Sequence, residues 1–158
     1  MQPLNRRHAV AKRKSLKTDS CPVARALDVV GERWSLLIVR DAFDGMRRFG
    51  QFQKSLGVAR NILADRLQAL VEEGIFSVAP ASDGTAYQEY VLTDKGRSLF
   101  PVVVALRQWS EAQLFAPGEA HSQLLEQGSG AALRTLAVQA EDGHVLQASD
   151  TVVRKVQP

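Results

Sequence analysis

Residues 48–93 read RFGQFQKSLGVARNILADRLQALVEEGIFSVAPASDGTAYQEYVLT, and this stretch decides the fold. In its middle, apolar residues recur at the spacing of one helix face, at Ile62, Leu63, Leu67, Leu70 and Val71. Upstream, Phe49, Phe52 and Leu56 repeat at three and four residues and predict a shorter helix. Gly57 supplies the permissive backbone of a sharp turn between them. The stretch therefore predicts two helices across a tight turn.

A β-hairpin is predicted directly after the second helix. Gly74 is a helix terminator, and 75–78 and 87–92 are β-prone runs. A Ser-Asp-Gly turn signal at 82–84 separates them. Helix, turn, helix and hairpin form the order of a winged-helix domain.

Two helices are expected before this core, near 22–30 and near 35–43, where Pro22 suits a first helical turn. The second helix is predicted to bury its larger apolar residues, Leu36, Leu37, Val39 and Phe43, with Trp34 packed in the core between the two helices. Residues 1–19 are expected to be a flexible basic arm.

After the wing, Thr93 is expected to cap one long helix whose apolar stripe comprises Leu99, Phe100, Val103, Leu106, Trp109, Leu114 and Phe115. A small domain cannot cover a stripe of this length, so we expect it to pack against a second copy of the chain and the first helix. The expected dimer-interface residues are Leu27, Leu99, Val103, Leu106, Trp109 and Leu114.

The last part of the chain changes composition. Residues 116–130 are rich in Pro, Gly, Ser and Gln and predict a linker. Beyond it, 133–138 and 145–156 flank an Asp142-Gly143 turn and predict a small β-hairpin or an extended tail. The expected fold class is α+β, mainly α, with a winged domain at 20–115 and an extension at 116–158.

A family resemblance rests on an ordered set of short motifs, and each of them alone is weak. The motifs are CP at 21–22, GERW at 31–34, RF at 48–49, LADRL at 63–67, GI at 74–75 and EYVLTDKG at 89–96. Together they resemble the HxlR-type winged-helix transcriptional regulators of bacteria and archaea, over residues 20–113. The resemblance implies a homodimer that binds double-stranded DNA, most commonly as a repressor.

Charge is distributed unevenly along the chain, although the formal net charge is only +3. Residues 1–66 hold 14 Lys and Arg against 6 Asp and Glu, whereas residues 67–158 hold 6 against 11. Positive charge gathered around the expected reading helix suits a polyanionic partner. For residues 1–19 alone, a solvated basic tail explains the charge equally well.

The first turns of the second motif helix are expected to meet base edges in the major groove, through Arg60, Asn61, Ala64 and Asp65. Arg60 suits guanine and Asn61 suits adenine, because each can form two hydrogen bonds in the plane of the base. A phosphate contact is an equal alternative for Arg60. For Asp65, an intramolecular partner among nearby arginines is the expectation.

Phosphate contacts are expected from Arg47, Arg48 and Lys54. Arg66, the arginine of LADRL, could anchor the helix to DNA backbone or to a protein carboxylate. Two departures from the family pattern weaken the interface: Ala59 replaces the usual Ser cap, and no Lys or Arg lies between Arg66 and Lys95. The acidic wing would then contact phosphates only through polar groups, such as Tyr87, Gln88 and Thr85.

The single cysteine, Cys21, precedes the first helix, where the dipole favours a thiolate, and Arg25 follows one turn later. Some regulators that resemble this chain sense oxidants with a cysteine at this place. The alternative is a small buried apolar side chain. A small-molecule or oxidant effector is thus a possible partner.

An enzyme is not expected. His8, His121 and His144 are dispersed, and neither a metal-ligand cluster, a catalytic triad nor a phosphate-binding loop is recognisable, so no cofactor or metal is predicted. The longest apolar runs are far shorter than a membrane span, the N-terminus lacks a secretory signal, and one cysteine fits a reducing cytoplasm. The acidic wing leaves one alternative function, a winged-helix module that binds protein rather than DNA.

Overall fold

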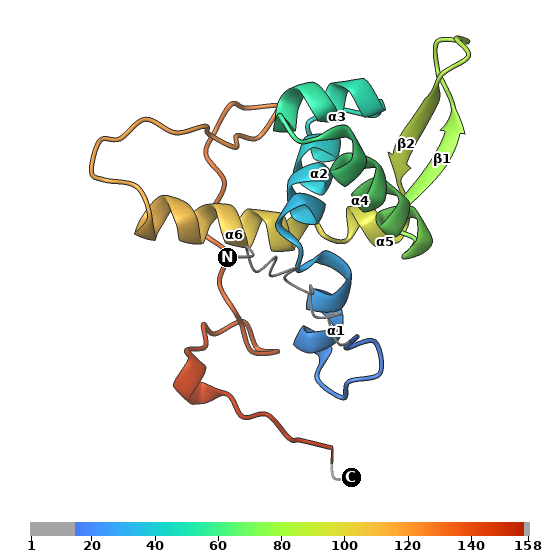
Figure 1. Ribbon diagram of the computed structural model, residues 1–158. Helices are drawn as coiled ribbons and strands as arrows, with labels where there is room; N and C mark the ends of the chain where they lie inside the picture. Colours follow the sequence, from blue (N-terminus) through green and yellow to red (C-terminus); the bar gives the residue numbers. More distant parts are fainter. Residues whose placement is uncertain (1–14, 157–158) are drawn as a thin grey trace, which may run out of the picture.

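A computed structural model describes residues 15–156 of the 158-residue chain. In chain order it contains α1 (Pro22–Val30), α2 (Arg33–Phe43), α3 (Phe49–Leu56), α4 (Arg60–Glu72), β1 (Phe76–Pro80), β2 (Gln88–Leu92), α5 (Asp94–Arg97), α6 (Phe100–Gln113) and a 3-10 turn, η1 (Ala148–Asp150). The predicted helix-turn-helix followed by a wing is confirmed. Figure 1 shows α3 and α4 beside the β1–β2 hairpin, with α6 below them and α1 below α6.

The core lies where α2, α3, α4 and the base of the wing meet. Its fully buried side chains are Ile38, Val39, Phe52, Leu63, Leu67, Leu70, Ile75 and Phe76. Phe52 of α3 and Phe76 of β1 pack edge to face, with ring centroids 6.3 Å apart. This contact joins the first motif helix to the wing.

The helix α2 begins two residues earlier than predicted, because Glu32 accepts a hydrogen bond from the Trp34 backbone N–H at 3.0 Å and caps it. Its buried apolar residues are Ile38 and Val39, so the prediction that Leu36, Leu37 and Phe43 are buried was wrong; they are half-buried. The Ile38–Val39 face of α2 packs into the core, and Leu36 and Leu37 therefore face α6.

Glycines end both helices of the motif. Gly57 closes α3 in the left-handed conformation, with φ of 60°. After α4, Gly74 at φ of 69° and Ile75 donate their backbone N–H groups to the carbonyls of Val71 and Leu70. This paired arrangement is a Schellman motif, and it turns the chain directly into β1.

The wing is a two-stranded antiparallel sheet in which Phe76 pairs with Leu92 and Pro80 pairs with Gln88. Each strand begins one residue later than predicted. The connecting loop contains the expected turn, with Gly84 at φ of 74°. At the base of the wing, the Thr93 backbone N–H donates to the Ile75 carbonyl at 3.0 Å.

The single long helix predicted after the wing is two helices, which corrects the prediction. Thr93 does act as a cap, but its hydroxyl accepts from the Gly96 N–H in the short helix α5. Gly96 lies so close to the Ile75 carbonyl that a Cβ there would be 2.2 Å from its oxygen. This contact fixes α5 against the wing, and Pro101 then suits the first turn of a new helix, α6. Leu114 and Phe115 lie beyond its last residue.

The extension beyond α6 is mostly irregular, with isolated bridges between Leu125 and Ala132 and between Gln139 and Val145. The second bridge closes a minimal hairpin around the predicted Asp142-Gly143 turn, and the rest follows the extended-tail form of the prediction. Gln108 of α6 holds it through both amide atoms, donating to the Arg134 carbonyl at 2.9 Å and accepting from the Leu136 N–H at 2.8 Å. Figure 1 shows its last part (red) running down past α6 and ending below α1. Among residues 15–156, no helix combines the length and apolarity that a bilayer crossing requires.

Candidate nucleic-acid interface

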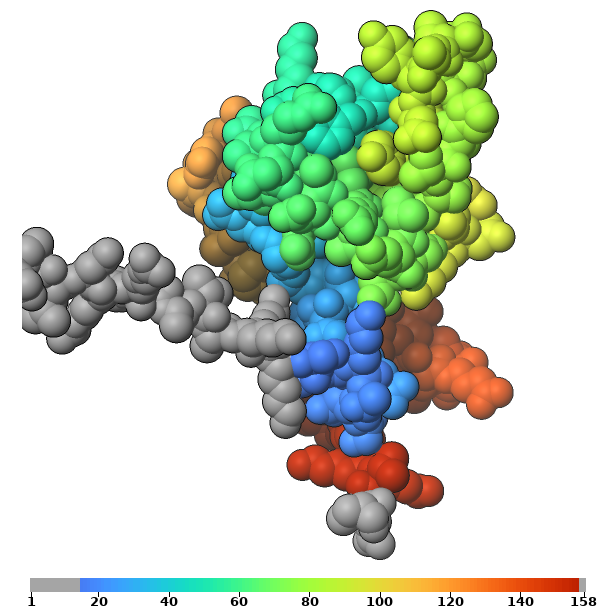
Figure 2. Space-filling model, turned by 45° about the vertical axis from the view of Figure 1, so that its right-hand side comes forward, coloured from blue at the N-terminus to red at the C-terminus, as the bar shows by residue number. Residues whose placement is uncertain are grey.

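The exposed face of α4 carries the residues predicted to read DNA. Arg60, Asn61, Ala64 and Asp65 are exposed, whereas Leu63, Leu67 and Leu70 on the opposite face are buried in the core. Figure 2 shows α4 (green) at the surface, with the wing beside it and α1 below. Burial of one face thus holds the other in a fixed orientation toward solvent.

The N-terminus of α4 is open. Ala59 provides no side-chain cap, as predicted from the sequence. The first N–H groups of α4, at the positive end of the helix dipole, therefore point toward solvent without a side-chain acceptor. The Arg60 guanidinium lies over the Phe49 ring, 5.1 Å from its centroid. Within residues 15–156, no carboxylate pairs with Arg60. Phe49 therefore orients this guanidinium while its N–H donors remain available.

Arg47 and Arg48, at the start of α3, contact two carboxylates of the wing. Arg48 Nη2 lies 2.5 Å from Asp83 Oδ2 and 3.5 Å from Glu89 Oε1, and Arg47 Nη1 lies 3.8 Å from Glu89 Oε2. The Glu89 side chain is only 6% exposed, and Ser82 donates to it at 3.1 Å. We call Arg47, Arg48, Asp83 and Glu89 the wing cluster.

The wing cluster gives the acidic residues of the wing a structural role. Its carboxylates compensate the two arginines and hold the wing against α3, and the Tyr90 N–H also donates to the Arg47 carbonyl at 2.7 Å. The hydrogen bond from Arg48, followed by those from Thr85, holds the pKa of Asp83 well below its usual range. The contribution of this pair to stability is therefore complete above the usual Asp pKa of about 4, and it is lost as the pH falls toward the lowered pKa of Asp83. A phosphate would have to compete for both arginines.

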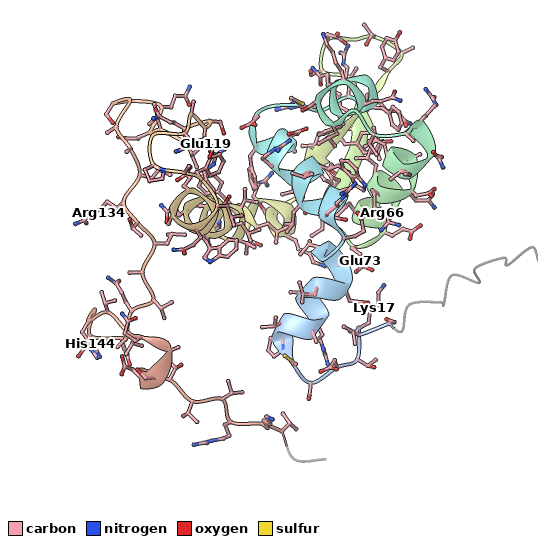
Figure 3. All side chains as sticks on the ribbon, turned by 60° about the vertical axis from the view of Figure 1, so that its left-hand side comes forward. Lys17, Arg66, Glu73, Glu119, Arg134 and His144 are labelled. Carbon is pink, nitrogen blue, oxygen red and sulfur yellow. The ribbon has the colours of Figure 1, made fainter. Side chains whose placement is uncertain are left out.

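The remaining predicted contacts lie around this face. Lys54 on α3 is exposed, as are Tyr87 and Gln88 at the wing. Arg66, labelled in Figure 3, is half-buried on α4. The expected intramolecular partner of Asp65 is not found in the part of the chain that the structure describes, because α4 presents this carboxylate to solvent. Lys54, Tyr87, Gln88 and Arg66 keep their assignments as predictions.

The segment before α1 makes contacts that the sequence did not reveal. Lys17 pairs with Glu73 at the C-terminal end of α4 (Figure 3), and this contact raises the pKa of Lys17. The Leu16 N–H donates to Asp28 of α1 at 3.0 Å. Residues 15–19 are thus anchored to both helices, while the rest of the predicted arm, 1–14, lies outside the described residues.

Cys21 is exposed at the start of α1, so the buried alternative for this side chain was wrong. Its backbone N–H donates to Asp19 Oδ1 at 2.8 Å. The Arg25 guanidinium, expected to act on the thiol, instead donates to the Asp19 carbonyl.

The expected dimer face is divided between surface and core. On α6, Leu106 is 48% and Trp109 58% exposed, and Leu27 of α1 and Leu114 are also exposed. Leu99 and Val103 instead pack partly against the core. The open apolar surface on α6 therefore includes Val102, Leu106 and Trp109, and part of α1 adds to it. Phe100 lies on another side of α6 and packs edge to face on Phe43, with ring centroids 5.2 Å apart.

Between residues 15 and 156, no group of three or more His, Cys, Asp or Glu side chains is placed to hold a metal ion. Of the histidines that are described, His121 and His144 are exposed.

Comparison with known families decides the assignment, because the model of the HxlR-like helix-turn-helix matches residues 29–117, more than half of the chain. The chain belongs to this family. The HxlR-like match ends near the end of α6 and leaves most of the extension outside it.

Individual relatives agree with this assignment. A curated relative of this HxlR-like chain, the uncharacterised HTH-type transcriptional regulator Rv3095 of Mycobacterium tuberculosis, is 50% identical over 95 residues; the match covers 60% of this chain and only 60% of the relative. The crystal structure of PA1607, provisionally described as a transcription factor, is 57% identical with a TM-score of 0.86, covering 90% of this chain and all of that one. The redox regulator HypR in its oxidised form is 30% identical with a TM-score of 0.55, covering 61% of this chain and all of that one.

Proposed function

We propose that this HxlR-like regulator is a sequence-specific repressor that binds double-stranded DNA as a homodimer in the cytoplasm. The observation that carries the proposal is the exposed face at the uncapped start of α4, where Arg60 and Asn61 have no carboxylate partner within residues 15–156. Each subunit would place this face in one major groove, with half-sites about one helical turn or a multiple of it apart.

Within that interface, Arg60 and Asn61 would contact base edges, and Lys54 and the N–H groups at the start of α4 would contact phosphates. Arg47 and Arg48 hold the wing in place and would reach phosphates only by exchanging their carboxylate partners. Specificity therefore resides in α4, and the wing contributes mainly orientation.

Removing one carboxylate of the wing cluster should strengthen nonspecific DNA binding. Asp83→Asn frees Arg48 for a phosphate and deletes one negative charge near DNA, so affinity for a scrambled duplex should rise about 3- to 10-fold at low salt. Fluorescence anisotropy measures this. Asp94→Asn, which deletes an exposed carboxylate paired with Arg97 on α5, is the control and should have little effect. An unchanged affinity for Asp83→Asn would show that Arg48 does not reach DNA.

The homodimer is supported by the exposed apolar side of α6. A charge placed there should weaken self-association, because a buried, unpaired carboxylate is costly. Trp109→Glu should convert the dimer to a monomer at micromolar concentration in light scattering coupled to size exclusion. Ser55→Glu, which adds the same charge at an exposed position of α3, should leave the dimer intact. A Trp109→Glu protein that remains dimeric would place the interface elsewhere.

A redox response through Cys21 is the finer part of the proposal. Its support is the exposure of the thiol at the start of α1, together with the similarity to HypR, which is named a redox regulator. A mild thiol oxidant should weaken operator binding by the parent protein and leave Cys21→Ser unaffected. Equal responses of the two proteins would remove Cys21 as the sensor.

The function itself is tested by selecting binding sequences from a randomised duplex library with the reduced protein. A dimeric reader should enrich a near-palindromic site with two half-sites. If no sequence is enriched over the starting library, the chain is not an operator-binding regulator, and the protein-interaction alternative takes its place.

A further inference from the structure

A cavity of about 380 Å³ lies between α2, α6 and the segment that follows α6. Leu36 and Leu37 of α2 line one side, and Val103 and Leu106 of α6 line the other. Phe115 lines it from the segment beyond α6. Its volume falls within the range of about 300–1,000 Å³ that is usual for small-molecule pockets.

Arg107 adds a directed polar group to this apolar lining. Its Nη1 donates to the Ser122 carbonyl at 2.7 Å and to the Ser122 hydroxyl at 3.1 Å, and it lies 3.4 Å from Glu111 Oε1. Neither Nε nor Nη2 has a hydrogen-bond partner among residues 15–156. These two atoms form one edge of the guanidinium, and two parallel N–H groups on such an edge match a carboxylate.

The carboxylates around the cavity are already compensated. Glu111 Oε1 lies 3.4 Å from Arg107 Nη1, which compensates its charge, and the His121 Nδ1 lies 3.8 Å from the same oxygen. Arg40 also lines the cavity, and it binds Asp41 Oδ1 through Nε and Nη2, at 2.8 and 2.6 Å. The described residues offer no partner to Arg40 Nη1. Guanidinium donors thus remain unused on both helices, and Arg107, at 24% exposed, is partly shielded from water.

We propose that this cavity binds a small organic acid. Its aromatic or branched aliphatic body would lie between the leucines of α2 and α6, and its carboxylate would accept two hydrogen bonds from the free edge of Arg107. A neutral molecule of the same shape would fill the apolar part but would lose the charge-assisted bonds. The site therefore distinguishes acids from their neutral counterparts.

A second, smaller cavity of about 200 Å³ shares Arg107, Glu111 and His121 with the first. The extension lines its far side with Leu125 and Ala132. Because its volume is below the usual range for a ligand pocket, we place the acid in the larger cavity. Ser110 lines only the larger cavity and Ala132 only the smaller one, which gives a matched pair of variants.

The test uses the full chain without DNA, titrated in a calorimeter with 2-naphthoate and, separately, with 2-naphthamide. We expect saturable binding of one 2-naphthoate per chain, about ten-fold tighter than 2-naphthamide. Ser110→Phe, which fills the larger cavity, should weaken 2-naphthoate binding at least about ten-fold, whereas Ala132→Phe should not. Absence of saturable binding, equal affinity for acid and amide, or the reverse order of the two variants would overturn the proposal.

Arg107→Gln tests the carboxylate contact directly. It should weaken 2-naphthoate binding about ten-fold and change 2-naphthamide binding little, because only the acid uses the charge-assisted bonds. A thermal melt of the variant checks that its fold is retained. Equal losses for both molecules would contradict a bidentate role for Arg107.

An effect of the acid on DNA binding would rest additionally on the proposed function. The helix α2 packs against α4 and also lines the cavity, so a ligand could favour one orientation of the reading helices. Because acid binding is measured first and without DNA, a protein that does not bind the acid is distinguished from a protein that does not recognise an operator.

Discussion

The double variant Arg60→Ala/Asn61→Ala should lose most of the preference for the operator over a scrambled duplex. Each side chain that makes two hydrogen bonds to a base contributes about 1–3 kcal/mol of discrimination, so the operator preference should fall about 30- to 30,000-fold when both are removed. Both residues are exposed on α4, so the fold should be retained. Anisotropy titrations with the two duplexes, at one salt concentration, measure the change.

The control for this prediction is Gln68→Ala, also exposed on α4 but two turns further along the helix. It should preserve the operator preference within about two-fold, because only the first turns of a reading helix reach base edges. Equal losses of operator and scrambled binding in the double variant would show that Arg60 and Asn61 contact phosphates instead.

Phe52→Ala should produce the largest loss of stability. Phe52 is fully buried and packs edge to face on Phe76, so its removal leaves a cavity between α3 and the wing. Such truncations reduce the free energy of unfolding by about 3–5 kcal/mol. Urea denaturation followed by circular dichroism measures it, at one protein concentration because a dimer's stability depends on concentration.

Tyr87→Ala provides the comparison, since Tyr87 is exposed at the wing and its ring lies 5.7 Å from the Arg48 guanidinium. Its removal should cost less than about 1 kcal/mol. If Phe52→Ala were no less stable than Tyr87→Ala, the core would not depend on the α3–wing contact.

Patterns among neighbouring residues were enough to predict most of the fold from the sequence. The range predicted for the first helix is that of α1, and the apolar spacing along α4 identified both its buried face and its exposed face. Glycines 57, 74 and 84 mark turns because their left-handed backbone conformation is costly for other residues. Such features depend on neighbours within a few positions, which a single sequence contains.

Features that depend on distant contacts could not be predicted in this way. The separation of α5 from α6 follows from the close approach of Gly96 to Ile75, and the half-exposure of Leu36 and Leu37 follows from the position of α6. The partners of Arg47 and Arg48 come from the wing, more than 30 residues further along the chain. Their sequence position near α3 suggested phosphate contacts, and only the folded wing reveals the competing carboxylates.

The central claim, that the exposed face of α4 reads DNA sequence, is tested most directly by an anisotropy salt series on the reduced protein. The two duplexes are the gene's own upstream DNA and its scrambled counterpart. We predict steep salt dependence for both, because each phosphate contact releases a counterion, and tighter binding to the upstream DNA at every salt concentration. Absence of binding to either duplex, even at about 50 mM salt, would contradict DNA recognition and favour a protein-binding module.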